Sequence, residues 1–188
     1  MKSREELKAW LESNDSELES IISSDIGRHV ELLRFSGLDF YGYAALPGEH
    51  TTMPNPATLA AAYNCNTDIE PKDAHDPYYR YCVNEWQNFV MDGFDASVAC
   101  LERRLRDFRS IHPTDPRRRV FDEVETAFFA RINHSILNAM QKLRNTATFA
   151  EETFLIVWFP HPNEEITNRS ARVLNSEGVY QLYAEHVE

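Results

Sequence analysis

Several common signatures of catalysis are missing from this sequence of 188 residues. It contains only six glycines, and none of them forms the Gly-rich loop that holds a dinucleotide or a nucleoside phosphate. It also has no Cys-x-x-Cys pair, no His-Glu-x-x-His segment and no nucleophile elbow. These absences exclude the commonest nucleotide-binding, zinc and hydrolase classes. They leave open an enzyme whose catalytic residues are dispersed along the chain.

Metal-ligand spacing is missing as well. No two of the seven histidines are four residues apart, so we predict no metal site and no cofactor. The three cysteines, Cys65, Cys82 and Cys100, are an odd set without a close pair, which fits a reducing compartment. No apolar stretch follows the first charged residues, so we expect no secretory signal and a cytoplasmic location.

Long apolar runs and excess positive charge are also absent. The longest apolar run, Phe154–Phe159, is far shorter than the roughly 20 residues of a membrane-spanning helix. The net charge of −11 argues against nucleic acid as a partner, because phosphate binding needs a basic surface. With 43% hydrophobic and 26% charged residues, the composition is that of one globular domain.

The charge is unevenly distributed along the chain. Residues 101–119 contain seven arginines and three acidic residues, a net charge of +4, which leaves −15 for the rest. One hypothesis is a patch that binds an anion or an acidic partner, and the simpler interpretation is solvated helix faces paired with neighbouring acids. The candidate patch residues are Arg103, Arg104, Arg106, Arg117, Arg118 and Arg119.

The apolar periodicity predicts a single α+β domain over 1–188, with a central, mostly antiparallel sheet covered by several helices. In chain order we expect N-terminal helices over 1–36, a strand cluster over 39–83, two long helices over 95–144, a strand over 153–159 and C-terminal helices over 164–187. The second long helix is expected from about Pro116, with Asp115 as its N-cap.

Within the strand cluster, the aromatic-rich segment 78–83 is predicted as a third strand. Residues 58–66 stay open between helix and strand, because their alanines favour a helix and their position after a strand and a loop favours a strand. Residues 86–92 are expected to form a short helix or a loop.

Acidic side chains gather between residues 68 and 95. They would form either a carboxylate-lined cleft or partner-facing patch, or only a polar loop kept soluble by its charge. Trp86 would be either a core side chain or a binding anchor. The candidate binding residues at the strand ends are Tyr41, Tyr43, Asn66, Asp68, Glu85, Trp86 and Asp92.

Several short segments carry a family resemblance. They are Phe40-Tyr41-Gly42-Tyr43-Ala44, Ala61-Ala62 leading to Asn66-Thr67-Asp68, Asn84-Glu85-Trp86, and Ser170 followed by Leu174-Asn175. Together they resemble a bacterial family, domain of unknown function 4303, which commonly has Glu in place of Asp68. The resemblance implies a compact α/β protein without an established enzyme activity. By analogy, small acidic proteins of this style are similar to immunity proteins of bacterial toxin systems, including the SUKH superfamily.

Three functions follow as hypotheses. The first is a non-catalytic, cytoplasmic, immunity-like or adaptor module whose acidic surface masks a basic protein partner such as a nuclease toxin, through Asp68, Asp92, Glu85 and Trp86. The second is a small-ligand-binding or enzymatic domain with a pocket lined by Tyr41, Tyr43, Asn66, Asp68, Glu85 and Trp86. The third is an oligomeric role through the apolar faces at 7–11 or 180–183. The sequence predicts no membrane partner and leaves the oligomeric state open.

Overall fold

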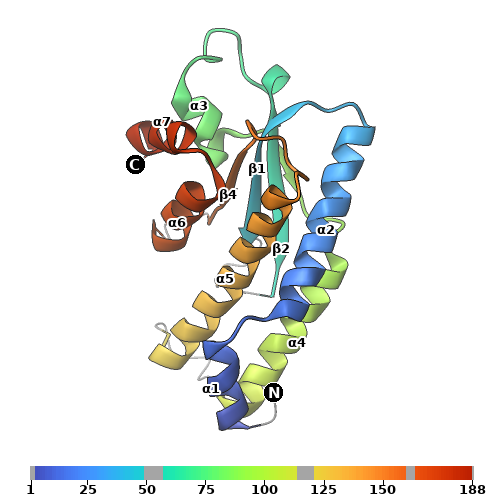
Figure 1. Cartoon of the computed structure of the whole chain (residues 1–188), viewed down its shortest axis with the longest axis vertical. Coiled ribbons are helices and arrows are strands. Elements are labelled where there is room, and N and C mark those ends of the chain that lie inside the picture. The colour runs from blue at the N-terminus through green and yellow to red at the C-terminus, as the bar shows by residue number, and fades with distance from the viewer. Residues whose placement is uncertain (1–2, 49–56, 114–120, 160–163, 188) are drawn as a thin grey trace.

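The computed structural model describes residues 3–48, 57–113, 121–159 and 164–187. Figure 1 shows a small sheet held among helices. The elements are α1 (Arg4–Glu12), α2 (Ser16–Phe35), β1 (Phe40–Pro47), β2 (Leu59–Cys65), α3 (Pro77–Tyr81), β3 (Asn88–Val90), α4 (Asp95–Ile111), α5 (Glu123–Asn145), β4 (Phe154–Val157), α6 (Glu164–Leu174) and α7 (Glu177–Val187), with 3-10 turns at Asn66–Asp68 and Val83–Glu85. The predicted α+β class is confirmed.

The sheet has four strands in the order β3-β2-β1-β4. The β1–β2 and β2–β3 pairings are antiparallel, whereas β4 pairs parallel to β1. The prediction of a mostly antiparallel sheet therefore holds for two of three pairings, and the sheet as a whole is mixed. The parallel pairing is possible because the helices α4 and α5 separate β4 from the first three strands and supply the long connection that it needs.

Helices cover both faces of the sheet. Alternate residues of β1 point to opposite sides: Tyr43 and Ala45 enter the larger core, which α2, α4 and α5 share. Ala44 and Leu46 enter a smaller core with residues of α3 and α7. All eight residues of β1 are buried, as expected for a central strand covered on both sides. No helix within the described ranges is both long and apolar enough to cross a membrane.

The structure corrects two predictions between residues 76 and 92. Segment 78–83 is not a strand, because Asp76 caps a short helix and Pro77 occupies its first position. The Asp76 carboxylate accepts from the Tyr78 backbone N–H at 2.9 Å, and this local cap outweighs the β-propensity of the aromatic residues. The third strand lies instead at Asn88–Val90, inside the segment expected to be a helix or a loop.

The structure settles two further boundaries. Segment 58–66, left open from the sequence, contains the strand β2, because its alanines pack closely between β1 and β3. The second long helix begins at Glu123 and not near Pro116. Asp122 accepts from the backbone N–H groups of Val124 and Glu125 while Glu125 accepts from that of Asp122, which forms a capping box. The predicted cap Asp115 and Pro116 lie outside the described residues.

Two side chains of the α6 region protect the outer edge of β4. The Asn175 side chain accepts from the Leu155 N–H at 2.8 Å and donates to the Leu155 carbonyl at 2.7 Å. Ser170 Oγ accepts from the Val157 N–H at 2.9 Å. These side chains take the place of a neighbouring strand and close this edge to further pairing. The segment that carried the family resemblance at Ser170 and Asn175 thus has a structural role.

We expect Asn175→Ala to lower the free energy of unfolding by about 2 kcal/mol, because it leaves the Leu155 N–H and carbonyl without partners at a buried edge. Asn175→Asp keeps the acceptor but sets a carboxylate oxygen against the Leu155 and Ala171 carbonyls, so we expect a loss at least as large. Urea unfolding of both variants measures the difference. Equal stability of Asn175→Ala and the wild type would show that water replaces the side chain at no cost.

Candidate functional site

Five of the seven candidate binding residues come together beside the carboxyl end of β2. They lie on β1, on the 3-10 turns at Asn66–Asp68 and Val83–Glu85, and directly after the second turn. Side chains from α3 and β3 join them. We call the polar part of this arrangement the β2–β3 cluster: Tyr41, Asn64, Asn66, Asp68, Arg80 and Asn88.

Asn64 lies at the centre of the β2–β3 cluster. Its side-chain amide donates to the Tyr41 hydroxyl at 2.8 Å, and its carbonyl oxygen accepts from the Gln87 backbone N–H at 3.1 Å. The side chain is almost completely buried, so these bonds satisfy polar groups that would otherwise be costly. Burial raises the pKa of Tyr41, which therefore stays protonated at neutral pH. Asn64 joins β1, β2 and the start of β3.

Asp68 fixes the turn that follows β2. Its Oδ2 atom accepts from the Cys65 backbone N–H and from the Asn88 side chain, both at 2.8 Å. The carboxylate therefore ties the end of β2 to the first residue of β3. Burial, and then the negative charge of Asp68, raise the pKa of Cys65 to about 11, so this thiol is not a nucleophile at neutral pH.

Arg80 of α3 covers one side of the β2–β3 cluster. Its guanidinium carbon lies 4.2 Å from the centre of the Tyr41 ring, at stacking distance, and its NH1 donates to Asn66 at 3.2 Å. A cation over an aromatic face is stabilised by the ring quadrupole. The contact holds α3 against the sheet and leaves Asn66 itself exposed.

Trp86 is a core side chain in this structure. Its side chain is 3% exposed, and its ring packs against Gly42 and the aromatic ring of Phe154. A Cβ atom at Gly42 would lie 2.7 Å from the ring, so glycine is required for this approach. The Trp86 indole N–H donates to the Arg80 carbonyl at 3.2 Å. Trp86 therefore supports α3 from beneath and does not reach a partner.

Tyr43 lies on the opposite face of the sheet from Tyr41. Period-two alternation would place the two tyrosines together, but the register of β1 against β2 shifts between Phe40 and Gly42. Tyr43 is fully buried in the larger core, where its hydroxyl lies 2.9 Å from His29 Nδ1. Burial raises the pKa of Tyr43, so the hydroxyl keeps its proton, and the tautomer of His29 sets which of the two groups donates.

The buried His29 predicts a pH dependence of stability. Burial lowers its pKa from 6.5, so between the two values the unfolded chain binds a proton that the folded chain does not. We expect the free energy of unfolding to fall as pH drops below 6.5. Urea titrations of wild type and His29→Gln between about pH 7.5 and about pH 5 test this.

The His29→Gln variant should show a flatter decline over this range. His75→Gln, at an exposed position in the loop before α3, is the comparison variant and should lose stability with falling pH as the wild type does. Identical slopes for wild type and His29→Gln would mean that His29 does not control the acid response.

Acidic and aromatic side chains lie in and around the β2–β3 cluster and beyond the end of β3. Residues 66–95 hold seven acidic and two basic residues. We call their carboxylates the acidic surface: Asp68, Glu70, Asp73, Asp76, Glu85, Asp92 and Asp95. Tyr78 and Tyr79 are 42% and 37% exposed among them, and Tyr78 donates to Glu85 at 3.2 Å.

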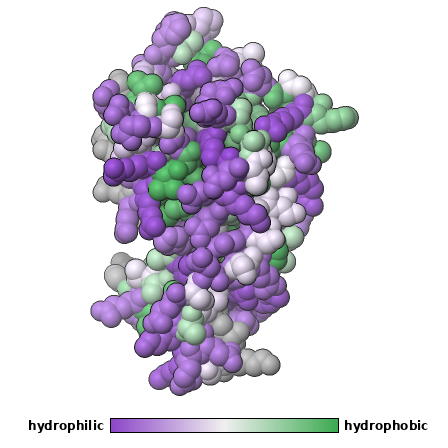
Figure 2. Space-filling model, viewed as in Figure 1, coloured by the Kyte–Doolittle hydropathy of each residue, from purple (hydrophilic) through white to green (hydrophobic). Residues whose placement is uncertain are grey.

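Asp92 is exposed beyond β3, away from the cluster. Figure 2 shows the end of the molecule over loop 66–76 as mostly hydrophilic.

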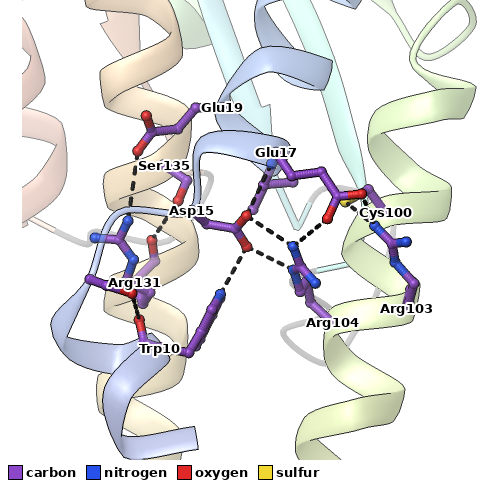
Figure 3. Close-up of polar contacts among 11 residues, drawn as sticks. Trp10, Asp15, Glu17, Glu19, Cys100, Arg103, Arg104, Arg131 and Ser135 are labelled. Carbon is purple, nitrogen blue, oxygen red and sulfur yellow. Dashed lines mark hydrogen bonds and ion pairs between the residues drawn. The ribbon is translucent and has the colours of Figure 1, made fainter. Parts of the chain in front are cut away.

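The arginine segment has a different environment. Arg104 binds Asp15 with two hydrogen bonds, at 2.7 and 2.9 Å, and Arg103 and Arg104 both contact Glu17 (Figure 3). These pairs hold α4 against the start of α2. Arg106 is exposed, and the other candidates, Arg117, Arg118 and Arg119, lie outside the described residues. Two of the described arginines are thus occupied by acids of another helix.

Sequence reasoning missed Asn64, Arg80 and Asn88, which complete the β2–β3 cluster. Asn64 carried a signal, because an amide in a run of alanine and aromatic residues must find a buried partner. Arg80 carried none, since its role depends on a helix where a strand was expected. Within the described part of the chain, no three His, Cys, Asp or Glu side chains gather closely enough to hold a metal ion.

The chain belongs to the family described as domain of unknown function (DUF4303), whose model matches residues 28–176. The match spans all four strands and every residue of the β2–β3 cluster, and it leaves α1, the first part of α2 and α7 outside. Neither the curated proteins nor the solved structures contain a match to the chain.

Proposed function

We propose that this protein is a non-catalytic, cytoplasmic binding module that uses its acidic surface to bind a basic protein partner, as an immunity protein or an adaptor would. The observation that carries the proposal is the separation between the buried and the exposed groups. The polar atoms of the β2–β3 cluster, one oxygen of Asp68 included, bind one another, whereas Glu70 and Asp76 are exposed on the same segment as the exposed Tyr78 and Tyr79.

This arrangement suits protein recognition. Tyrosines supply large contact area with a polar end, and carboxylates around them attract a basic partner and speed its approach. Tyr78 keeps its proton, because the nearby Cys82 and Glu85 raise its pKa to about 12. It can therefore act as a neutral contact residue. The cluster beneath holds α3 and β3 in fixed positions, so little ordering accompanies binding.

The alternative, a small ligand bound at the strand ends by Asn66, Asp68 and Glu85, is less well supported. Tyr41, Asn64 and one oxygen of Asp68 already use their hydrogen-bonding capacity to join β1, β2 and β3. Trp86 and Tyr43 are buried on either side of the sheet. A ligand at this site would have to break bonds that hold the strands together.

Affinity capture of the full chain from its host cells tests the proposal. We expect a partner retained at about 50 mM salt and released at about 500 mM, because exposed charge interactions are screened. The double variant Glu70→Lys/Asp92→Lys, at two exposed positions, should lower its recovery at least about tenfold.

The control variant Glu12→Lys/Glu102→Lys makes the same charge change at exposed positions on α1 and α4. It should retain the partner. Equal recovery of the partner by both double variants, or recovery that salt does not change, would contradict a role for the acidic surface.

A further inference from the structure

The two edges of the sheet differ in whether their outward backbone groups have hydrogen-bond partners. Asn175 and Ser170 bind the outward backbone groups of β4, so that edge is closed. At the other edge, no segment within the described ranges pairs with the outer side of β3. An unprotected edge offers N–H and C=O groups to an added strand.

The β3 segment is fixed at both ends. Before it, the Gln87 N–H donates to Asn64, and the Asn88 side chain donates to Asp68. After it, Arg28 donates to the Gly93 carbonyl at 3.0 Å. Between these anchors β3 pairs with Ala61, Ala62 and Tyr63 of β2. The edge is thus already in strand geometry, and an added strand does not have to order it.

Exposed apolar side chains lie along this edge. Phe89 is 47% exposed and Met91 is 55% exposed. Phe89 stands opposite Ala62, on the sheet face that carries Trp86 and α3. Aromatic and methionine side chains are enriched where proteins bind one another. The two residues can therefore contact alternate side chains of a strand placed beside β3.

The negative charge around β3 favours a basic strand over a second copy of this chain. Asp68 lies at the start of β3, and Asp92 and Asp95 are exposed after its end. Arg28, which contacts the Gly93 carbonyl after β3, is already paired with Asp25 at 2.7 Å. A second copy of this chain would bring the same carboxylates against these and would be repelled. A strand carrying lysine or arginine would find complementary charge.

We propose that β3 is a docking edge, at which a basic, extended segment of the partner adds as a fifth strand and covers Phe89 and Met91. The proposal rests on the binding function proposed above and specifies its geometry. Main-chain hydrogen bonds to β3 would supply affinity, while the carboxylates and the two apolar side chains would supply selectivity.

A synthetic peptide of alternating lysine and valine serves as the probe. We expect it to bind the full chain and to protect from hydrogen exchange those backbone N–H groups of 88–90 that face away from β2. Its twin, N-methylated on alternate residues along one edge, should bind at least about tenfold more weakly, since it cannot complete the ladder. A glutamate–valine peptide should show no binding.

Matched substitutions locate the contact. Phe89→Ser should weaken peptide binding at least about tenfold, whereas Phe35→Ser, at a position 92% exposed at the end of α2, should leave it unchanged. Equal binding of the methylated peptide, protection elsewhere in the chain, or self-association through β3 would overturn strand addition. None of these results affects the salt-sensitive capture that tests the acidic surface, so the two proposals can fail separately.

Discussion

Arg104→Ala is expected to lower the free energy of unfolding by about 3 kcal/mol, because it leaves a buried carboxylate without its counter-charge. The Asp15 side chain is only 4% exposed, and Arg104 donates to both of its oxygens. The same carboxylate accepts from the Trp10 indole and the Leu18 N–H and so fixes the corner between α1 and α2. Loss of the Arg104–Asp15 ion pair therefore affects α1, α2 and α4 together.

Arg103→Ala is the matched control for this prediction. Arg103 contacts Glu17 at 2.7 Å, but both side chains are about half exposed. Exposed ion pairs contribute about 0–1 kcal/mol, so we expect little change in stability. Chemical unfolding of both variants measures the contrast. Losses of equal size would contradict the role assigned to burial of Asp15.

Trp86→Ala is expected to cost about 3–5 kcal/mol of unfolding free energy, because it opens a large cavity beneath α3. The ring lies between Gly42 and Phe154 in the smaller core, and its N–H holds the Arg80 carbonyl. The variant also removes the support of Arg80 over Tyr41. We therefore expect hydrogen exchange to increase in α3 before it increases in α2 or α5.

A double-mutant cycle with Gly42→Ala isolates this packing. Alone, Gly42→Ala should cost about 1–3 kcal/mol, because its Cβ would lie 2.7 Å from the indole ring. In the Trp86→Ala background the same substitution should cost much less, since the ring is gone. Strictly additive losses would show that the two residues do not share one packing constraint.

The sequence predicted the long elements well, because their apolar periods reflect burial directly. α2, α4 and β1 lie close to their expected ranges, and the closing helices α6 and α7 follow 164–187. The prediction failed at α3 and β3, where two or three local contacts decide the structure. An Asp76 cap and a single proline make a helix from a tyrosine-rich segment, and pairing with β2 makes a strand from a mixed one.

The sequence predicted where the candidate site lies, but not which side chains contact one another there. Asn66, Asp68 and Glu85 converge because the turns after β2 and α3 meet at one end of the sheet. The register shift between Phe40 and Gly42 turns Tyr41 away from the face that Tyr43 and Ala45 share, which alternation could not reveal. The arginine patch was predicted from sequence neighbours, but Asp15 and Glu17, which bind Arg103 and Arg104, lie at the start of α2, far away in the chain.

The most direct test of the account is a hydrogen-exchange footprint of the captured complex. If the acidic surface binds the partner, the loop 66–76, α3 and β3 should gain protection, while α1 and the exposed side of α4 should not change. Protection that instead centred on α4 around Arg103 and Arg106, with residues 66–92 unchanged, would contradict the proposal. It would identify the arginine segment as the binding surface.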